Sequence, residues 1–320
     1  MIVRLTISLV CVAATSAFAA PLDYPQRPVR VIVGGPAAGG ADILARAVAQ
    51  KLADNLGQQF VIDNRAGASG IIGTEMTARA APDGYTLGVG HSGTHAINLS
   101  LHKSLPYHPL KDFTPLMLIA QVPNILVVYP GLAARTVPEL IALAKAKPGQ
   151  MTFASGGTGY SQHLAGVLFC DIAGVQMLHV PYKGSTPGIT DVISGNVMMM
   201  FPNVTAALPQ IKSGRLRALG VTSLKRSAVL PDVPAIAETL RGYEATAWFG
   251  FFAPAGLPPA LTRFVNAEMV KAVSDPKVRE AIQNQGADVA GDTPEQFRAF
   301  VAGEITKWAR IVKAAGITPE

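Results

Sequence analysis

The chain has 320 residues, and its hydrophobic content of 49% is ample for two packed cores, which excludes a disordered chain. The formal net charge is +6, but the cations are scattered among acids, as in Lys51 with Asp54. No stripe of Lys and Arg with interleaved aromatic residues occurs, so the sequence predicts no nucleic-acid partner.

The N-terminus has the pattern of a secretory signal peptide over residues 1–19. Arg4 precedes an apolar stretch over 5–14, and Ala17, Phe18 and Ala19 form a small-x-small cleavage site. The apolar run is too short to span a bilayer. We therefore expect export to the periplasm with cleavage near Ala19. The alternative is a buried N-terminal strand or a short anchor helix.

Three strand-loop-helix units follow along the chain. The patterns predict strands over 29–33, 59–63 and 85–89, each followed by a loop rich in Gly, Ser or Thr and by the start of a helix. Helical spacing of apolar residues is clearest over 42–56. Units of this kind in succession predict a parallel sheet flanked by helices.

The same theme begins again after about residue 123. Strands are predicted over 151–154, 177–180 and 197–201, each leading into a loop and a helix. Two extended passages, near 120–126 and 246–253, separate this set from the first and from three predicted C-terminal helices.

The predicted fold class is therefore α/β with two lobes, each a mostly parallel sheet flanked by helices. We expect a discontinuous first lobe over 20–122 and 246–320, and a second lobe over 123–245. Loops at the carboxyl ends of the two sheets would then face one cleft.

Four of these loops carry most of the functional information: 36–42, 66–70, 92–94 and 155–161. A helix N-terminus offers unpaired N–H groups and a partial positive charge, so it binds carboxylates or phosphates without a cationic side chain. Hydroxyl groups in the loops would add donors: Ser69, Ser92, Thr94, Ser155 and Thr158. The alternative is that each of these residues only caps its own helix.

Enzyme and metal motifs fit the sequence less well. The segment from Gly90 to Thr94 resembles the G-x-S-x-G elbow of serine hydrolases with Ser92 as nucleophile, but Thr94 replaces the final Gly. His91 and His95 are four residues apart with no acid beside them, so no metal site is predicted. Neither phosphate-binding glycine motif is present, and no cofactor is expected. A hydrolase that uses Ser92 remains an alternative.

Aromatic residues near these loops are candidates for the walls of a pocket: Tyr160, Tyr182, Phe201 and Trp248. Trp248 lies in the continuous apolar segment 247–251, which fits a buried strand equally well.

Several segments match one known family in the same order. The first are YPQRP at 24–28, the loop with Gly39, Gly40 and Asp42, NRAGA at 64–68 and PDGYTL at 82–87. Later come HVPYKG at 179–184, LRALGVT at 216–222, WFG at 248–250 and APAG at 253–256. Through these segments the chain resembles, from Tyr24 onward, the Bug-type extracytoplasmic solute receptors of tripartite tricarboxylate transporters.

The resemblance implies a periplasmic binding protein of the Venus-flytrap type, which is not an enzyme. It would act as a monomer, bind a small carboxylate through loop amides, hydroxyls and water, and deliver it to membrane transporter subunits. The ligand-binding residues that we expect are Ala38, Gly39, Asp42, Ser69, Ser92 and Thr94 in the first lobe, and Ser155, Gly156, Thr158, Tyr160, His163 and Asn203 in the second.

Two departures from the family pattern concern the ligand. Gly34 and Gly35 stand where the family usually has Pro-Phe, so one aromatic wall is missing. Pro202 stands where many members have an acid, which favours a ligand without an ammonium group. A sensor or adaptor that reports ligand occupancy to a signalling partner would share all of these features and remains a second alternative.

Overall fold

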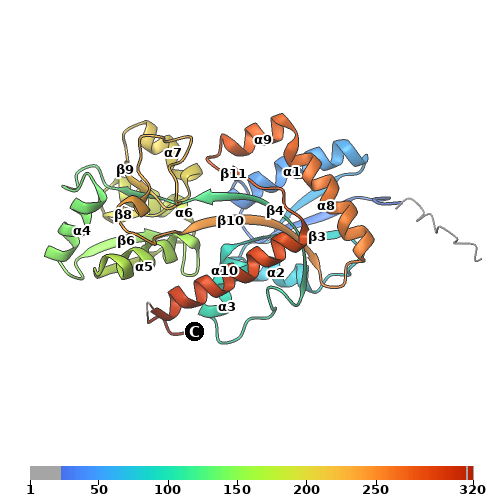
Figure 1. The fold of residues 1–320 in the computed structure, drawn as a ribbon, viewed down its shortest axis with the longest axis horizontal. Coiled ribbons are helices and arrows are strands. Elements are labelled where there is room, and N and C mark those ends of the chain that lie inside the picture. The colour runs from blue at the N-terminus through green and yellow to red at the C-terminus, as the bar shows by residue number, and fades with distance from the viewer. Residues whose placement is uncertain (1–22, 315, 320) are drawn as a thin grey trace, which may run out of the picture.

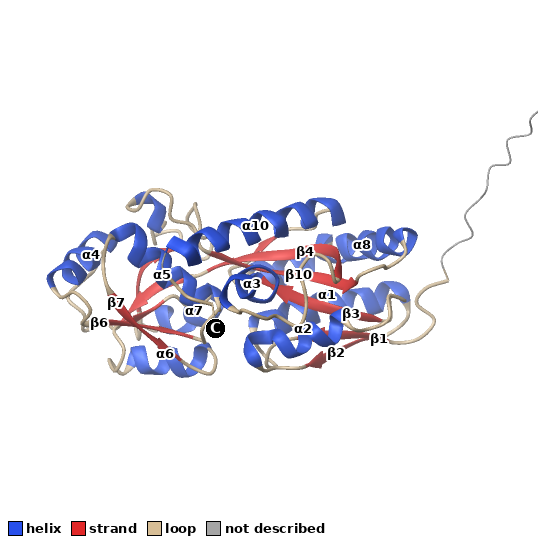
Figure 2. Cartoon of the chain, turned by 90° about the horizontal axis from the view of Figure 1, so that it is seen from below, coloured by secondary structure: helices blue, strands red, loops and turns tan. Residues whose placement is uncertain are grey.

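The computed structural model describes residues 23–314 and 316–319, so the predicted signal peptide lies outside the described residues. The described chain forms two lobes, each built on one sheet with helices around it (Figure 1). Two long strands, β4 (Phe113–Pro123) and β10 (Thr246–Pro254), run from one lobe towards the other in both views (Figures 1 and 2). The predicted α/β, two-lobed fold class is confirmed.

The first lobe contains a six-stranded sheet in the order β11-β4-β10-β3-β1-β2. Its strands are β1 (Val29–Val33), β2 (Phe60–Asn64), β3 (Thr86–His91), β4 (Phe113–Pro123), β10 (Thr246–Pro254) and β11 (Asp288–Val289). Its helices are α1 (Gly40–Leu56), η1 (Ala68–Gly70), α2 (Ile71–Ala78), η2 (Gly93–Ile97), α3 (Asn98–Leu101), α8 (Pro259–Ser274), α9 (Pro276–Gln283) and α10 (Pro294–Ala314).

The second lobe contains a five-stranded sheet in the order β7-β6-β8-β5-β9. Its strands are β5 (Ile125–Val128), β6 (Met151–Ser155), β7 (Met177–Pro181), β8 (Met199–Met200) and β9 (Arg217–Val221). Its helices are α4 (Val137–Ala146), α5 (Ser161–Ala173), α6 (Ser185–Ile193), α7 (Val204–Lys212) and η3 (Ile236–Glu238).

Both sheets are mixed. The strand-loop-helix units give parallel pairs, β1 with β2 and β3 in the first lobe and β6 with β7 and β8 in the second. The strands that enter or leave a lobe pair antiparallel, as β10 does with β3 and β4, and β5 with β8 and β9. The sequence pattern reveals the parallel pairs, because only these require a helical crossover.

The first unit shows why the sequence folds this way locally. The alternating Val and Ile side chains of β1 are almost all buried, as expected for a central strand of a sheet covered on both faces. In α1, Leu44, Val48 and Leu52 share one buried face. The helix ends at Gly57, whose φ of 70° is the left-handed conformation that glycine adopts without strain. The packing of this buried face fixes the position of α1 on the sheet, and with it the place where the helix begins.

The lobes are connected by a two-stranded ribbon. Strand β4 pairs with β10 along its whole length, from Thr246 opposite Pro123 to Pro254 opposite Phe113. One residue beyond this pairing, Asn124 leads into β5 of the second lobe. We call the paired strands β4 and β10 the crossing ribbon.

Thr222, at the end of β9, fastens both strands of the crossing ribbon to the second lobe. Its Oγ1 accepts a hydrogen bond from Asn124 N–H at 2.8 Å and lies 2.9 Å from the carbonyl oxygen of Ala245. The main chain adds two bonds, from Thr222 N–H to the Asn124 carbonyl and from Ala245 N–H to the Thr222 carbonyl. The Thr222 side chain is fully buried, so its position follows that of the ribbon.

Helix α10 reinforces this connection. It lies along the crossing ribbon in both views (Figures 1 and 2). One hydrophobic cluster includes Phe252 of the first lobe, Trp308 of α10 and Phe169 of the second lobe, whereas two other clusters belong to single lobes. None of the helices within residues 23–314 and 316–319 is apolar over a length that would cross a membrane.

We predict that Thr222→Val lowers the free energy of unfolding by about 2 kcal/mol, because the buried Asn124 N–H loses its acceptor while the side-chain shape is kept. Denaturant titration followed by circular dichroism would measure this loss. Thr306→Val is the matched control: Thr306 is exposed on α10, and a change within about 0.5 kcal/mol is expected there. Equal effects of the two substitutions would contradict the role assigned to Thr222.

Candidate functional site

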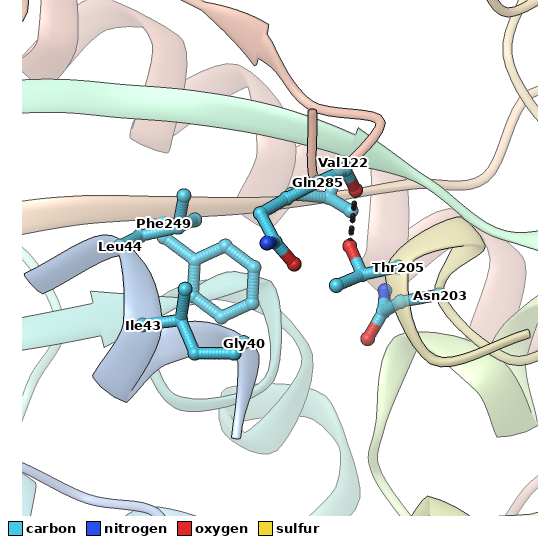
Figure 3. Close-up of a pocket in the computed structure, with 8 residues that line it drawn as sticks. All are labelled: Gly40, Ile43, Leu44, Val122, Asn203, Thr205, Phe249 and Gln285. Atoms are coloured by element: carbon cyan, nitrogen blue, oxygen red, sulfur yellow. Dashed lines mark hydrogen bonds between the residues drawn. The ribbon is translucent and has the colours of Figure 1, made fainter. Parts of the chain in front are cut away.

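Two helix N-termini, one from each lobe, face a common cavity. Helix α1 follows Gly39 and helix α7 follows Asn203, and at neither end does a side chain cap the helix. Figure 3 shows Gly40 of α1 on one side of the gap and Asn203 and Thr205 of α7 on the other. Unpaired N–H groups and the positive ends of two helix dipoles therefore point into one space.

The cavity is small, with a volume of about 10 Å³, which is room for roughly one water molecule. Ile43, Leu44 and Phe249 line it on the side of the first lobe, together with Val122 of the crossing ribbon. Its polar lining comes from Asn203, Thr205 and Gln285. None of these lining residues is charged, so an anion bound here would rely on amide dipoles and helix ends.

Residues around the cavity also form contacts between the two lobes. The hydroxyl of Thr205 donates a hydrogen bond to the main-chain carbonyl of Gln285, which lies beyond α9 of the first lobe (Figure 3). Asn203 donates from Nδ2 to Asn124 Oδ1 at 2.7 Å, and this bond fixes the start of α7 beside the crossing ribbon. Asn203, one of the predicted site residues, thus lies at the cavity.

Asp42 anchors the loop before α1. Its carboxylate accepts hydrogen bonds from Ala38 N–H and from Arg46 Nε, both at 2.9 Å, and only 3% of Asp42 is exposed. Burial by itself raises the pKa of Asp42, but the bonds from Arg46 and Ala38 outweigh it and lower the pKa below its usual value. Ala38 takes a left-handed φ of 60° in this loop. Both residues therefore shape the loop that presents Gly39 and Gly40.

Gly34, directly after β1, is needed for close packing. A Cβ on Gly34 would lie 2.8 Å from the carbonyl oxygen of Gly70, which is closer than side chains allow. A Cβ on Gly35 would meet nothing within 4 Å. The space beside Gly35 is therefore open.

A second contact between the lobes joins the loop after β2 to the loop after β6. Ser69 donates its hydroxyl hydrogen bond to the carbonyl oxygen of Thr158 at 3.2 Å. Ala68 and Ser69 both have positive φ, 45° and 53°, which is uncommon for residues with a side chain. This turn aims Ser69 at the second lobe, so two of the predicted site residues meet.

His91 and Tyr160 form a third contact between the lobes. Their rings are stacked, with centroids 6.0 Å apart and planes 13° from parallel, and His91 also lies 6.2 Å from the Phe249 ring. The N–H of Gly93 donates to Nδ1 of His91, which requires that nitrogen to be unprotonated. Burial lowers the pKa of His91 to about 4, so the ring is neutral near pH 7. Tyr160, one of the predicted site residues, thus lies at the boundary between the lobes.

Ser92 and Thr94 lie behind this contact and not in open space. Ser92 is 2% exposed, and Thr94 is completely buried. The Thr94 hydroxyl contacts the main chain of His91 and lies 2.9 Å from Nδ1 of His95. These bonds hold the turn between β3 and the π-helical segment η2, a rare form of helix that is frequently found at functional sites.

In the second lobe, Ser155 and His163 fix the loop over 155–159 through hydrogen bonds and ring stacking. Ser155 Oγ lies 2.7 Å from Nε2 of His179, and the His163 ring is stacked on the His179 ring at 4.0 Å. Gly159 N–H donates to Nδ1 of His163. The N–H of Gly156, another predicted site residue, is already paired with Gln162 Oε1.

The predicted aromatic walls lie mostly elsewhere. Trp248 is 1% exposed and donates its indole N–H to Glu304 Oε2, so it faces α10 and not the cavity. Phe201 is fully buried between Phe153 and Phe169. Neighbouring Phe249, whose side chain points to the other face of the same strand, is the aromatic residue that lines the cavity.

Sequence patterns did not single out some residues that meet at the lobe boundary. Thr205 and Gln285 belong to segments without a recognisable motif, and Phe249 lies in the WFG segment at 248–250 without a predicted role. For His91 the sequence suggests no contact with the second lobe. The strand alternation in AWFGF does assign Trp248 and Phe249 to opposite faces, but it does not indicate which face meets the cleft.

A comparison with protein families gives one match that covers most of the chain. Residues 44–317 match the model described as tripartite tricarboxylate transporter family receptor. The chain belongs to this family. It is therefore a solute-binding receptor and not an enzyme, and the Ser92 hydrolase alternative is set aside.

Relatives of the receptor are similar along nearly their whole length. Protein BugT of Bordetella pertussis is 41% identical over 310 residues, which cover 95% of this chain and 94% of BugT. A protein from the tcbD-tcbE intergenic region of Pseudomonas sp. strain P51 is 40% identical over 291 residues, 90% of this chain and 86% of that protein.

Solved structures of the same kind superpose closely on the receptor. An R. palustris protein with adipate has a TM-score of 0.88 and 36% identity, covering 93% of this chain and 100% of that chain. MatC from Rhodopseudomonas palustris with bound malate has a TM-score of 0.83 and 31% identity, covering 90% and 100%. The periplasmic binding protein BugD has a TM-score of 0.84 and 34% identity, covering 93% and 100%.

The buried histidines predict how stability depends on pH. Burial and the neighbouring His179 lower the pKa of His163 to about 3, and burial lowers the pKa of His179 to about 4, against 6.5 in an unfolded chain. Below pH 6.5 the unfolded chain therefore binds protons that the folded chain does not. The stability that the neutral, buried rings of His163 and His179 contribute is therefore complete above pH 6.5. It is lost as the pH falls towards 3.

We expect the free energy of unfolding to fall between pH 6.5 and 4, and to fall less steeply in His163→Asn, which keeps a polar side chain beside Gly159. Urea titrations at several pH values would measure the two slopes. The variant and the parent should have parallel profiles above pH 7.5. Equal slopes below pH 6.5 would show that His163 does not contribute.

Proposed function

We propose that the receptor captures a small organic carboxylate between its lobes and delivers it to membrane subunits of a tripartite tricarboxylate-type transporter. The observation that carries the proposal is the pair of uncapped helix N-termini, of α1 and α7, that face one cavity from opposite lobes. Amide groups of this kind bind a carboxylate without a cation.

The lining of the cavity narrows the class of ligand. Apolar side chains of Ile43, Leu44 and Phe249 would contact the body of the ligand, while the helix ends hold its carboxylate. No acidic side chain lines the cavity to bind an ammonium group, and Pro202 stands where an acid would. Adipate and malate, bound by two similar structures, are carboxylates without an amino group.

Capture would require the lobes to open and close. The cavity has room for about one water molecule, and contacts such as Ser69 to Thr158 and His91 to Tyr160 close the boundary. We propose that 20–122 with 246–320, and 123–245, move as two bodies about the crossing ribbon. Binding then stabilises a closed form in which the gap is wide enough for the ligand and both helix ends reach it.

The setting that fits this function is the periplasm. We propose that the chain is exported, cleaved near Ala19 and active as a monomer, with no nucleic-acid partner and with the closed form recognised by the membrane subunits. Family membership and the periplasmic relative BugD support this setting.

Calorimetric titration with a panel of acids tests the proposed function. Adipate, malate, an aromatic acid and aspartate would be compared, with adipamide as the uncharged counterpart of adipate. We expect at least one carboxylate without an ammonium group to bind and to raise the melting temperature, since a ligand at a hundredfold excess over Kd stabilises by about 2.7 kcal/mol. Binding of adipamide as tight as that of adipate would contradict recognition through the charge.

A charge placed at the start of α7 tests the role of the helix ends. In Thr205→Asp the new carboxylate would compete for the same N–H groups, so we expect ligand affinity at least about tenfold weaker, or ~1.4 kcal/mol. Thr205→Asn is the matched control, because Asn has nearly the shape of Asp and also lacks the hydroxyl that Thr205 donates to Gln285. The two variants therefore differ only in the charge at position 205. Equal affinities of the two variants would place the carboxylate elsewhere.

A further inference from the structure

A groove with a volume of about 360 Å³ lies on the other side of the crossing ribbon. We call it the hinge groove. Gln121, Thr246 and Trp248 of the ribbon line it together with α10 and β11 of the first lobe. From the second lobe it is lined by Ser223, Leu224, Lys225 and Glu244.

The hinge groove and the ligand cavity lie on opposite faces of the ribbon. Trp248 is paired with Gln121 in the strand register, and both line the groove, whereas Val122 and Phe249, one residue further along each strand, line the cavity. Successive side chains of a strand point to opposite faces. In the order of the sheet, β11 and β4 lie on one side of β10, and β3, β1 and β2 lie on the other. The loops that meet the second lobe belong to this second group of strands.

The floor of the groove is held rigidly. Glu304 of α10 accepts hydrogen bonds from the indole N–H of both Trp248 and Trp308, at 3.0 and 2.9 Å. Lys307 pairs with Glu304 at 3.0 Å and also with Glu244 of the second lobe, so this second ion pair joins the two sides of the groove. The carboxylate of Glu304 is buried but fully paired, so this network resists rearrangement. The side that α10 forms is therefore fixed, and a change in the width of the groove would move Glu244 with the second lobe relative to Lys307.

The other wall of the groove belongs to the second lobe. Ser223 directly follows Thr222, which is bonded to both strands of the ribbon at the point where they enter the second lobe. The Ser223 hydroxyl donates to the carbonyl of Lys225 at 2.7 Å, which shapes the lip of the groove. When the second lobe rotates about the ribbon, the lip must move with it.

We propose that the hinge groove controls the balance between open and closed lobes: separating the lobes on the ligand side narrows the groove, so a side chain that fills it favours the closed form. This inference rests on the proposed capture of a ligand by lobe closure. In the structure the lobes are in contact on the ligand side, and the hinge groove is open. This is the arrangement expected if opening on the ligand side narrows the groove.

Ser223→Trp places an indole in the groove and tests the proposal. We expect release of the bound acid to slow by on the order of tenfold, because release requires the opening that the indole opposes. The radius of gyration of the ligand-free variant, measured by small-angle X-ray scattering, should decrease relative to the parent. Stopped-flow displacement would measure the release rate.

Two matched variants serve as controls. Ser223→Ala removes the hydroxyl bond to Lys225 without filling the groove, and Ser104→Trp adds an indole at an exposed loop position of the first lobe. Both should keep the parent's release rate and radius of gyration. The inference is overturned if Ser223→Trp folds with the parent's melting temperature and behaves as these controls do. The scattering comparison needs no ligand, so failure of the ligand panel leaves it intact.

Discussion

The pairing of β4 with β10 is the constraint on which the other features of this receptor depend. These strands are far apart in the sequence, yet they cross between the lobes as one antiparallel ribbon that Thr222 fastens at its far end. A single crossing segment would leave the lobes free to twist. Two hydrogen-bonded segments restrict their motion and keep the starts of α1 and α7 opposite each other.

This geometry explains how an anion can be held without a cation. The described lining of the cavity contains no charged side chain, and Asp42, in the first turn of α1, accepts hydrogen bonds from Arg46 and Ala38 N–H through Oδ2. The helix N–H groups that remain unpaired are the donors available to a ligand. Because these donors are fixed by the backbone of two rigid helices, they lose little conformational freedom when a carboxylate binds.

Many predicted site residues have a supporting role in the loops. Thr94, Ser155, Gly156 and His163 make hydrogen bonds within their own lobe, which fixes the turns that carry Gly93 and Gly159. Asp42 and Thr94 bond to the main chain of the loops before their helices, but neither caps its helix. Side chains fix the loops, and the loops present main-chain groups to the boundary between the lobes.

The sequence by itself determined the α/β class, the repeated strand-loop-helix units and the loops that lie near the boundary, because strand alternation, helical spacing and glycine-rich turns are local properties. It also revealed the family through motifs preserved in order. Only the tertiary structure decided that Phe249 and not Trp248 faces the cavity, that Thr205 meets Gln285 and that His91 stacks on Tyr160. These contacts join residues far apart in the chain, so they depend on how two separately folded sheets are placed by the crossing ribbon, which no local pattern encodes.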